Sequence, residues 1–442
     1  MASIGRPPPA PGTLLRGRRA LVVEASRRVR LMLREVVSGF GPDQVVSSDN
    51  ATDALDDLRA ERFDLIVCGQ VPGPGYDTVT LIERIRTLGL IPRCGTLVVL
   101  TPSRTTRDVV SLAAQGPDLC LIRPIGAAEL AQRLRATLEE KVLLEPVVEA
   151  IEAADVRASI ERTLALGPGR TELKRAALRM VCEDLLERRD TARAEEVLEL
   201  AAAFGDAPWM TLAQARIRTL QGQEAQALAL LERLVSDRPE FIASYDALAS
   251  IEADLGAFPS AVRHLEEANA RAGFSVSRFR RTGALAIRSG DLGLAESALD
   301  RLLGRVERSE LAEGADYVAM VDVLAARGKL ERAGQVAREL QRNHSYCPDS
   351  SVLLPLVVYR RRVEEGGDST AALETLLQAL EKAGPEVSVE TRLQVLEACL
   401  EQGLRREALA IARAIALSGR ADRFRLGRVR ALLERAPDHA PG

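Results

Sequence analysis

Three polar side chains, one of them a carboxylate that could act as a catalytic acid, stand where apolar runs of the sequence end. Glu24 closes the run ALVVE, Thr101 follows TLVVL, and Arg123 follows LCLI. If these runs are strands of one sheet, a carboxylate, a hydroxyl and a guanidinium meet at the same edge. The run DLIVC leads instead to Gly69, which has no side chain. Glu24 has no second acid or base nearby in the sequence, and we expect it to form a structural ion pair with Arg123.

Other residue types that carry catalysis or bind metals are scattered. The three histidines are His264, His344 and His439, and His344 alone has a cysteine close by, in HSYC. His344 and Cys347 fall short of the four ligands of a structural zinc site. The sequence therefore predicts no catalytic residue, no metal site and no cofactor.

Two kinds of pattern divide the chain near residue 125. Before it, short runs rich in Val, Leu and Ile alternate with segments whose apolar residues recur at helical spacing. This alternation predicts an α/β, doubly wound domain with a five-stranded parallel sheet covered by helices on both faces. Functional groups of such a domain gather at the carboxyl ends of its strands. The predicted strands are 20–24, 44–48, 64–68, 96–100 and 119–122.

Residues 18–138 resemble the receiver domains of response regulators. LVVE occupies the position of the family's first strand, and FDLIVCG followed by Pro72 occupies that of the phosphoacceptor strand and its loop. VVLT ends on Thr101, which matches the family's conserved hydroxyl, and LIRPIGAAEL matches the segment with a Lys-Pro pair. The resemblance implies the receiver fold over this range.

The resemblance does not extend to the family's chemistry. A phosphoacceptor needs a carboxylate nucleophile, and that position is Gly69. The family's acid pair falls on Glu24 and Ala25, so one of the clustered oxygen ligands that magnesium needs is missing. Arg123 replaces the lysine and is not its geometric equivalent. Thr101 alone is retained. The resemblance thus implies a degenerate phosphoacceptor pocket, in a pseudo-receiver that takes no phosphoryl group.

The pattern after residue 127 is helical throughout. A long helix is expected to begin there, and Pro146 is expected to break or kink it. The expected organisation is a flexible tail at 1–17, the receiver-like domain at 18–138, a helical linker at 139–170, helical repeats at 171–435 and a second tail at 436–442.

A Gly-x-x-x-x-Ala pattern recurs through the helical region. Gly222, Gly256 and Gly290 are 34 residues apart, and a fixed period of this length indicates a repeat solenoid. The following intervals are 38, 39 and 36 residues, and Arg189 with Ala194 reads as a worn upstream copy, which gives about seven repeats. The later copies begin at Gly328, Gly367 and Gly403.

These repeats resemble tetratricopeptide repeats (TPRs). Within 244–268, Tyr245, Leu248, Gly256 and Ala261 fit the family's positions. The resemblance implies an all-α TPR solenoid of antiparallel helix pairs, whose first helices line a groove for a peptide segment of another protein. The candidate groove residues are Arg216, Asp246, Ser250, Asp254, Arg280, Arg288 and Asp322.

Composition argues against several other classes of function. A formal net charge of −3 and the lack of a basic face favour neither nucleic acid nor a membrane surface as a partner. No apolar run approaches the ~20 residues that cross a bilayer. The start of the chain lacks the apolar core of a signal peptide, and the six cysteines have no paired spacing. These features predict a cytoplasmic location.

Two functions fit the sequence. The first is a non-enzymatic bacterial signal-transduction adaptor, in which the pseudo-receiver is coupled to a protein-binding TPR solenoid and self-association is a further option. The second is a phosphorelay response regulator of a two-component system, phosphorylated at an atypical site and using the TPR region as its output domain. The two hypotheses differ in what they require of Gly69.

Overall fold

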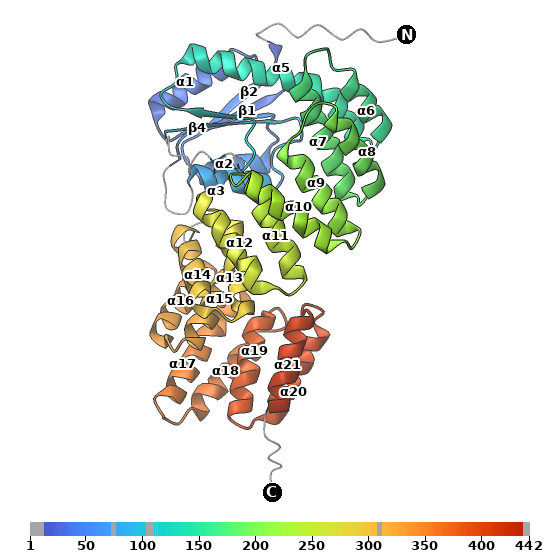
Figure 1. Ribbon diagram of the computed structural model, residues 1–442. Helices are drawn as coiled ribbons and strands as arrows, with labels where there is room; N and C mark the ends of the chain where they lie inside the picture. The colour runs from blue at the N-terminus through green and yellow to red at the C-terminus, as the bar shows by residue number, and fades with distance from the viewer. Residues whose placement is uncertain are drawn as a thin grey trace. The chain divides into compact units, whose positions relative to one another are not determined.

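The computed structural model describes residues 13–71, 77–102, 110, 112, 114–306 and 312–435. Pro72, His439, residues 1–12 of the first predicted tail and the whole of the second, 436–442, lie outside these residues. The chain divides into two compact units, Met1–Arg278 and Phe279–Gly442. Figure 1 shows the elements in chain order.

The first unit begins with the predicted five-stranded parallel sheet, in the order β2-β1-β3-β4-β5. Every residue of β3 and β4 is buried, as expected for strands with helices on both faces. Helices α1 and α5 lie on one face, and α2 and α3 lie on the other (Figure 1). The bounds are β1 Arg19–Val23, α1 Arg27–Ser38, β2 Gln44–Ser48, α2 Ala51–Ala60, β3 Leu65–Cys68, α3 Thr78–Thr87, β4 Thr96–Thr101, β5 Leu119–Ile122 and α5 Ala127–Glu152.

The residues just before β1 belong to the sheet domain rather than to a tail. Leu14 and Leu15 are 2% and 1% exposed and pack in the core beneath α1 and α5. The Leu15 N–H donates to the Phe40 carbonyl at 3.0 Å. The sheet domain thus includes residues before position 18, because two adjacent leucines supply apolar surface that the core buries.

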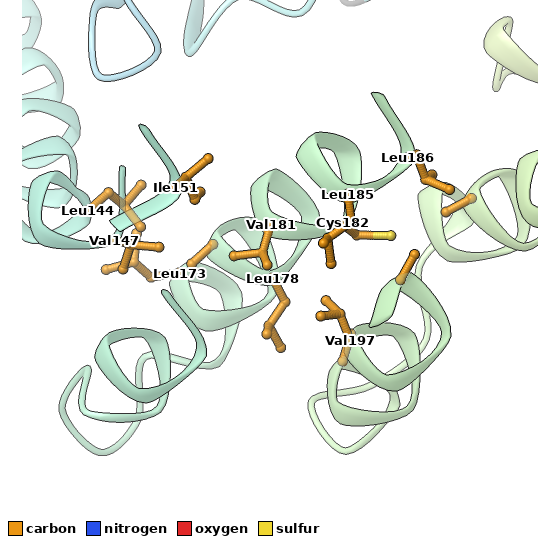
Figure 2. Close-up of a cluster of buried hydrophobic side chains, with 14 of the residues drawn as sticks. Leu144, Val147, Ile151, Leu173, Leu178, Val181, Cys182, Leu185, Leu186 and Val197 are labelled. Atoms are coloured by element: carbon orange, nitrogen blue, oxygen red, sulfur yellow. The ribbon is translucent and has the colours of Figure 1, made fainter. Parts of the chain in front are cut away.

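Helix α5 runs without a break through Pro146 and past the predicted boundary at residue 138. The expected break is wrong, although proline removes one helical hydrogen bond. Leu144, Val147 and Ile151 pack against α7, Thr171–Glu187, and α8, Thr191–Ala202, in one buried cluster (Figure 2). Burial on both sides of the proline holds the helix together. The segment predicted as a linker therefore forms the first layer of the repeat core, with α6 at Val156–Leu164.

Seven consecutive helix pairs, α7/α8 through α19/α20, fill the repeat region of the described chain, and α21 follows them. None of the described helices is long and apolar enough to cross a membrane. The remaining bounds are α9 Pro208–Leu220, α10 Glu224–Asp237, α11 Ala243–Asp254, α12 Phe258–Arg271, α13 Val276–Ser289, α14 Leu292–Val306, α15 Gly314–Ala326, α16 Leu330–Asn343, α17 Leu353–Glu364, α18 Thr370–Ala383, α19 Val389–Glu401, α20 Arg405–Leu417 and α21 Arg423–Arg435.

The turn inside each helix pair uses the left-handed backbone region. Gly222, Gly256 and Gly290 have φ of 71°, 80° and 82°, a conformation that costs glycine nothing. Arg189, the predicted worn copy, takes the same conformation with φ of 60°. In the α17/α18 pair, Gly366 and not the predicted Gly367 has the positive φ, of 69°. That turn is shifted by one residue, and the paired Ala372 is only half-buried.

Candidate functional site

The predicted pocket at the carboxyl edge of the sheet is filled by an ion pair. Glu24, which follows β1, is 1% exposed, and its Oε2 accepts from Nη2 of Arg123 after β5. The Ser26 N–H donates to Glu24 Oε1 at 2.9 Å, and the Gln70 N–H donates to Oε2 at 2.9 Å. Both carboxylate oxygens are therefore occupied by hydrogen-bond donors.

Gly69 lies against this ion pair. A Cβ atom built on Gly69 would overlap Glu24 Oε2 and lie 2.6 Å from Arg123 Nη2. The space that a phosphoacceptor side chain would need is taken by the two charged groups. The close approach of Glu24 to Arg123 therefore requires that residue 69 has no side chain.

The other two predicted pocket residues form part of the frame around the pair. The Ala25 N–H donates to the Gln70 carbonyl at 3.1 Å. Thr101, 7% exposed, accepts from the Arg123 N–H through its carbonyl oxygen at 2.9 Å. The sheet thus brings together all five residues that the sequence assigned to the pocket, and main-chain hydrogen bonds from neighbouring strand ends fix them.

The described residues hold no cluster of three His, Cys, Asp or Glu side chains placed to bind a metal ion. His264 lies 3.5 Å from Glu252 in the α11/α12 pair. His344 is buried, and burial lowers the pKa of its imidazole. Its Nδ1 lies 3.0 Å from the Tyr346 hydroxyl. Both histidines are thus packed against neighbouring side chains of the repeats.

Two of the predicted groove residues form ion pairs between successive helix pairs. Asp246 on α11 accepts from Nε and Nη2 of Arg278 at 2.9 and 3.1 Å. In the second unit, Arg280 donates to both carboxylate oxygens of Asp316 at 2.7 and 2.8 Å, and it pairs with Glu313 at 2.8 Å. Asp316 is 2% exposed. These charges hold the repeats together, a role that groove position alone does not reveal.

The other predicted groove residues differ in exposure. Arg216 and Asp254 are exposed, and Ser250 is half-buried. Arg288 lies over the Phe424 ring of α21, 5.0 Å from its centroid. Burial raises the pKa of the half-buried Asp322 carboxyl, against the opposing effect of Arg428 and Arg360. All seven candidates lie on the first helices of their pairs, as the TPR resemblance implies.

Further polar residues of the late repeats were not predicted. Arg360 on α17 pairs with Glu397 on α19 at 3.5 Å, and both act on the Asp322 carboxyl. Gln394, also on α19, is 1% exposed, and neither its amide oxygen nor its amide nitrogen has a hydrogen-bond partner. The late repeats depart from the 34-residue period. Their inward positions could therefore not be counted forward from the earlier repeats.

No protein-family model matches the chain. It is 30% identical over 134 residues to the virulence sensor protein BvgS of Bordetella pertussis, which covers 29% of this chain and 10% of BvgS. It is 32% identical over 120 residues to the DNA-binding response regulator MtrA of Mycobacterium tuberculosis, which covers 27% of this chain and 50% of MtrA. The chain spans half or less of the length of these relatives.

Two solved structures also overlap the chain. One is the C-terminal part of a TPR repeat-containing protein from Cytophaga hutchinsonii, with a TM-score of 0.39 and 12% identity over 57% of this chain and 98% of that chain. The other is PilW, a type IV pilus biogenesis factor, with a TM-score of 0.36 and 19% identity over 50% of this chain and 98% of that chain.

The sheet order, the filled pocket and the sequence similarity together indicate the family of the N-terminal region. The helix pairs with their left-handed turns indicate the fold of the remainder. The N-terminal region of about 120 residues is homologous to receiver domains, as the matches to MtrA and BvgS show, and an array of TPR-type helix pairs follows it.

Proposed function

We propose that this protein is a non-enzymatic, cytoplasmic adaptor of bacterial two-component signalling, in which a phosphorylation-deficient receiver is joined to a protein-binding TPR array. The observation that carries the proposal is the ion pair of the buried Glu24 with Arg123 against Gly69. A receiver works by forming an acyl phosphate on a carboxylate, and residue 69 has none.

The ion pair also supports a stable resting structure. An unpaired carboxylate with 2% of its side chain exposed would be costly, and Arg123 with two backbone N–H groups satisfies it. Both oxygens of the Glu24 carboxylate are thus bonded within the protein. In such a domain the outer surface is available to a partner at all times, because binding does not depend on phosphorylation.

Partner binding is assigned to the first helices of the repeats. Arg216 and Asp254 are exposed there, on α9 and α11, and have opposite charges. Charges at an interface contribute more to association rate and specificity than to raw affinity. The expected partner segment is a peptide of mixed polarity.

The first experiment tests phosphorylation. The full chain is incubated with acetyl phosphate and magnesium, beside a receiver that has its phosphoacceptor aspartate, and both are examined by intact-protein mass spectrometry. We expect a phosphoryl adduct on the control receiver alone. An adduct mapped to any residue of 18–138 in this chain would support the phosphorelay alternative instead.

The second experiment tests the repeat surface. Proteins captured by the full chain are identified by mass spectrometry, and their affinities are measured for wild type and for Arg216→Glu with Asp254→Arg. The matched control is Glu199→Arg with Arg233→Glu, since these exposed residues lie on the second helices α8 and α10. We expect the first pair alone to weaken binding and change its salt dependence. If the first-helix variant binds its partners with the same affinity as the control variant, the first helices are not the binding face.

A further inference from the structure

Glu83 is a buried carboxylate that the degenerate pocket does not use. It lies on α3, whose start is fixed by a capping box between Asp77 and Thr80. Glu83 is 6% exposed to solvent. A carboxylate is almost never buried to this extent in proteins unless it is paired or hydrogen-bonded. The identity of its partners therefore indicates what this surface of the receiver does.

The partners of Glu83 come from the repeat array, about 190 residues further along the chain. Its Oε2 accepts from the Val276 N–H at 2.9 Å, and its Oε1 accepts from the Ser277 N–H at 2.8 Å. The Ser275 hydroxyl donates to Oε1 at 3.1 Å. Val276 is the first residue of α13. Glu83 thus caps the N-terminus of a repeat helix from outside that helix.

The chemistry of this contact is specific for an anion. The first N–H groups of a helix have no intrahelical acceptor, and the helix dipole places partial positive charge at this end. Glu83 supplies a carboxylate at that point, in a nearly dry environment. Ser275, 4% exposed, donates to Glu83, and its Oγ also accepts from the Arg278 N–H at 3.3 Å.

The same segment is held on its other side by α11. Arg278, 7% exposed, forms the two hydrogen bonds to Asp246 described above. Val110 of the receiver packs against the buried cluster of Ile242, Tyr245, Ala268 and Ala272. An apolar contact and a charged one therefore join the receiver to residues 242–278 of the same unit.

A second contact joins the receiver to the start of the repeat array. Arg93, which precedes β4, pairs with Asp184 at 3.1 Å and with Glu187 at 3.2 Å on α7. Glu83 and Arg93 thus both join the receiver to helices of the repeat array in the same chain. Because the Arg93 side chain is 39% exposed, its pairs are expected to contribute less to stability than the buried hydrogen bonds of Glu83.

We propose that the receiver is a ligand of its own repeat array, and that Glu83 is the latch that docks the α3 face of the receiver on residues 242–278 of the same unit. The docked receiver engages Ser275, Val276 and Ser277 and covers the cluster beside Asp246. A partner that needs the Tyr245–Asp246 end of α11 must then compete with the receiver. This inference is independent of the partner proposed above, since it can be tested on the protein alone.

The test uses hydrogen exchange with mass spectrometry on the full chain. Glu83→Arg reverses the charge of the latch, and Ser277→Pro removes one donor from the array side without changing the receiver. Proline is compatible with the first turn of a helix. The matched control is Glu35→Arg, because Glu35 is an exposed acid on α1.

We expect peptides covering 242–246, 268–272 and 275–278 to exchange about tenfold faster in both latch variants, with β1 and β3 unchanged. Glu35→Arg should match wild type. If exchange rises at 275–278 alone, Glu83 is a local helix cap and the docking proposal is wrong. It is also wrong if all three segments keep their wild-type rates in Glu83→Arg and Ser277→Pro. If Glu83→Arg unfolds the receiver, the exchange rates of the same three segments in Ser277→Pro alone test the proposal.

Discussion

The strand ends of the receiver and the first helices of the repeats both carry charges where related folds bind ligands, but they use them differently. At the strand ends, the buried Glu24 bonds to the half-buried Arg123 and to the main chain. On the first helices, some charges link neighbouring helix pairs, as Arg280 and Asp316 do, and others such as Arg216 and Asp254 are exposed. The match to a family's motif therefore predicts where a charged residue lies. The residues around it determine whether it is exposed to a partner or bonded within the protein.

The largest effect is expected at the buried pair. Arg123→Met leaves the Glu24 carboxylate without its cation and should lower the free energy of unfolding by about 3–5 kcal/mol. Urea denaturation measures it. Arg233→Met is the matched control in the array, since Arg233 and Asp237 form an exposed pair at 3.6 Å, and it should change stability by no more than about 0.5 kcal/mol. Equal losses in the two variants would contradict the contrast between the regions.

A smaller loss is expected from restoring an acid at residue 69. Gly69→Asp must displace Glu24 or Arg123 and places two carboxylates together, so it should cost about 1–3 kcal/mol. The variant should not bind beryllofluoride, because the second metal acid is still missing at Ala25. Gly126→Asp is the control: it has open space, caps α5 and should be neutral or stabilising. Beryllofluoride binding, followed by fluorine NMR, would show that Glu24 and Arg123 suffice for the pocket.

In the second unit, removal of a buried polar group should stabilise the fold. Gln394→Leu replaces an amide that has no hydrogen-bond partner with an apolar group of similar size, and should raise the free energy of unfolding by about 1–2 kcal/mol. Gln378→Leu, on the exposed surface of α18, should lie within about 0.5 kcal/mol of wild type. Destabilisation by Gln394→Leu would indicate that this amide has a structural partner after all.

The smallest effect concerns pH. Burial raises the pKa of Asp322 in the folded state, so the folded protein holds this proton more tightly than the unfolded chain does. Stability therefore falls as pH rises from the usual range of an aspartate through the folded pKa, where the buried carboxyl ionises. Asp322→Asn should be more stable than wild type at neutral pH, and the difference should disappear in acid. Melting temperatures across this pH range measure it, and a constant difference would contradict the assignment.

Much of the repeat region could be predicted from single residues. Glycine at the turn and alanine five residues later recur because only small groups fit between paired helices, and Ala194, Ala227 and Ala261 are fully buried. Even Arg189 was placed correctly, although a left-handed arginine is unfavourable. The α17/α18 turn was misplaced by one residue because Gly366 and Gly367 are adjacent and either could make it.

The sequence could not predict the fate of Pro146 or of Leu14 and Leu15. A proline in a helical pattern favours a break, but the packing of Leu144 and Val147 on α7 and α8 outweighs one lost hydrogen bond. Residues near a chain end favour disorder, but the two leucines enter the core beneath α1 and α5. In both cases tertiary burial overrides a local preference.

By itself, the sequence determined the two folds, the lack of a carboxylate at residue 69 and the expected pairing of Glu24 with Arg123. Strand and helix periods are local, and parallel strand ends must meet at one edge of a sheet. The tertiary structure alone decided that this pair occupies the space beside Gly69, that Asp246 and Arg280 hold repeats together, and that Glu83 reaches the start of α13. These contacts join residues 32 to 193 positions apart, and no local pattern encodes such a distance.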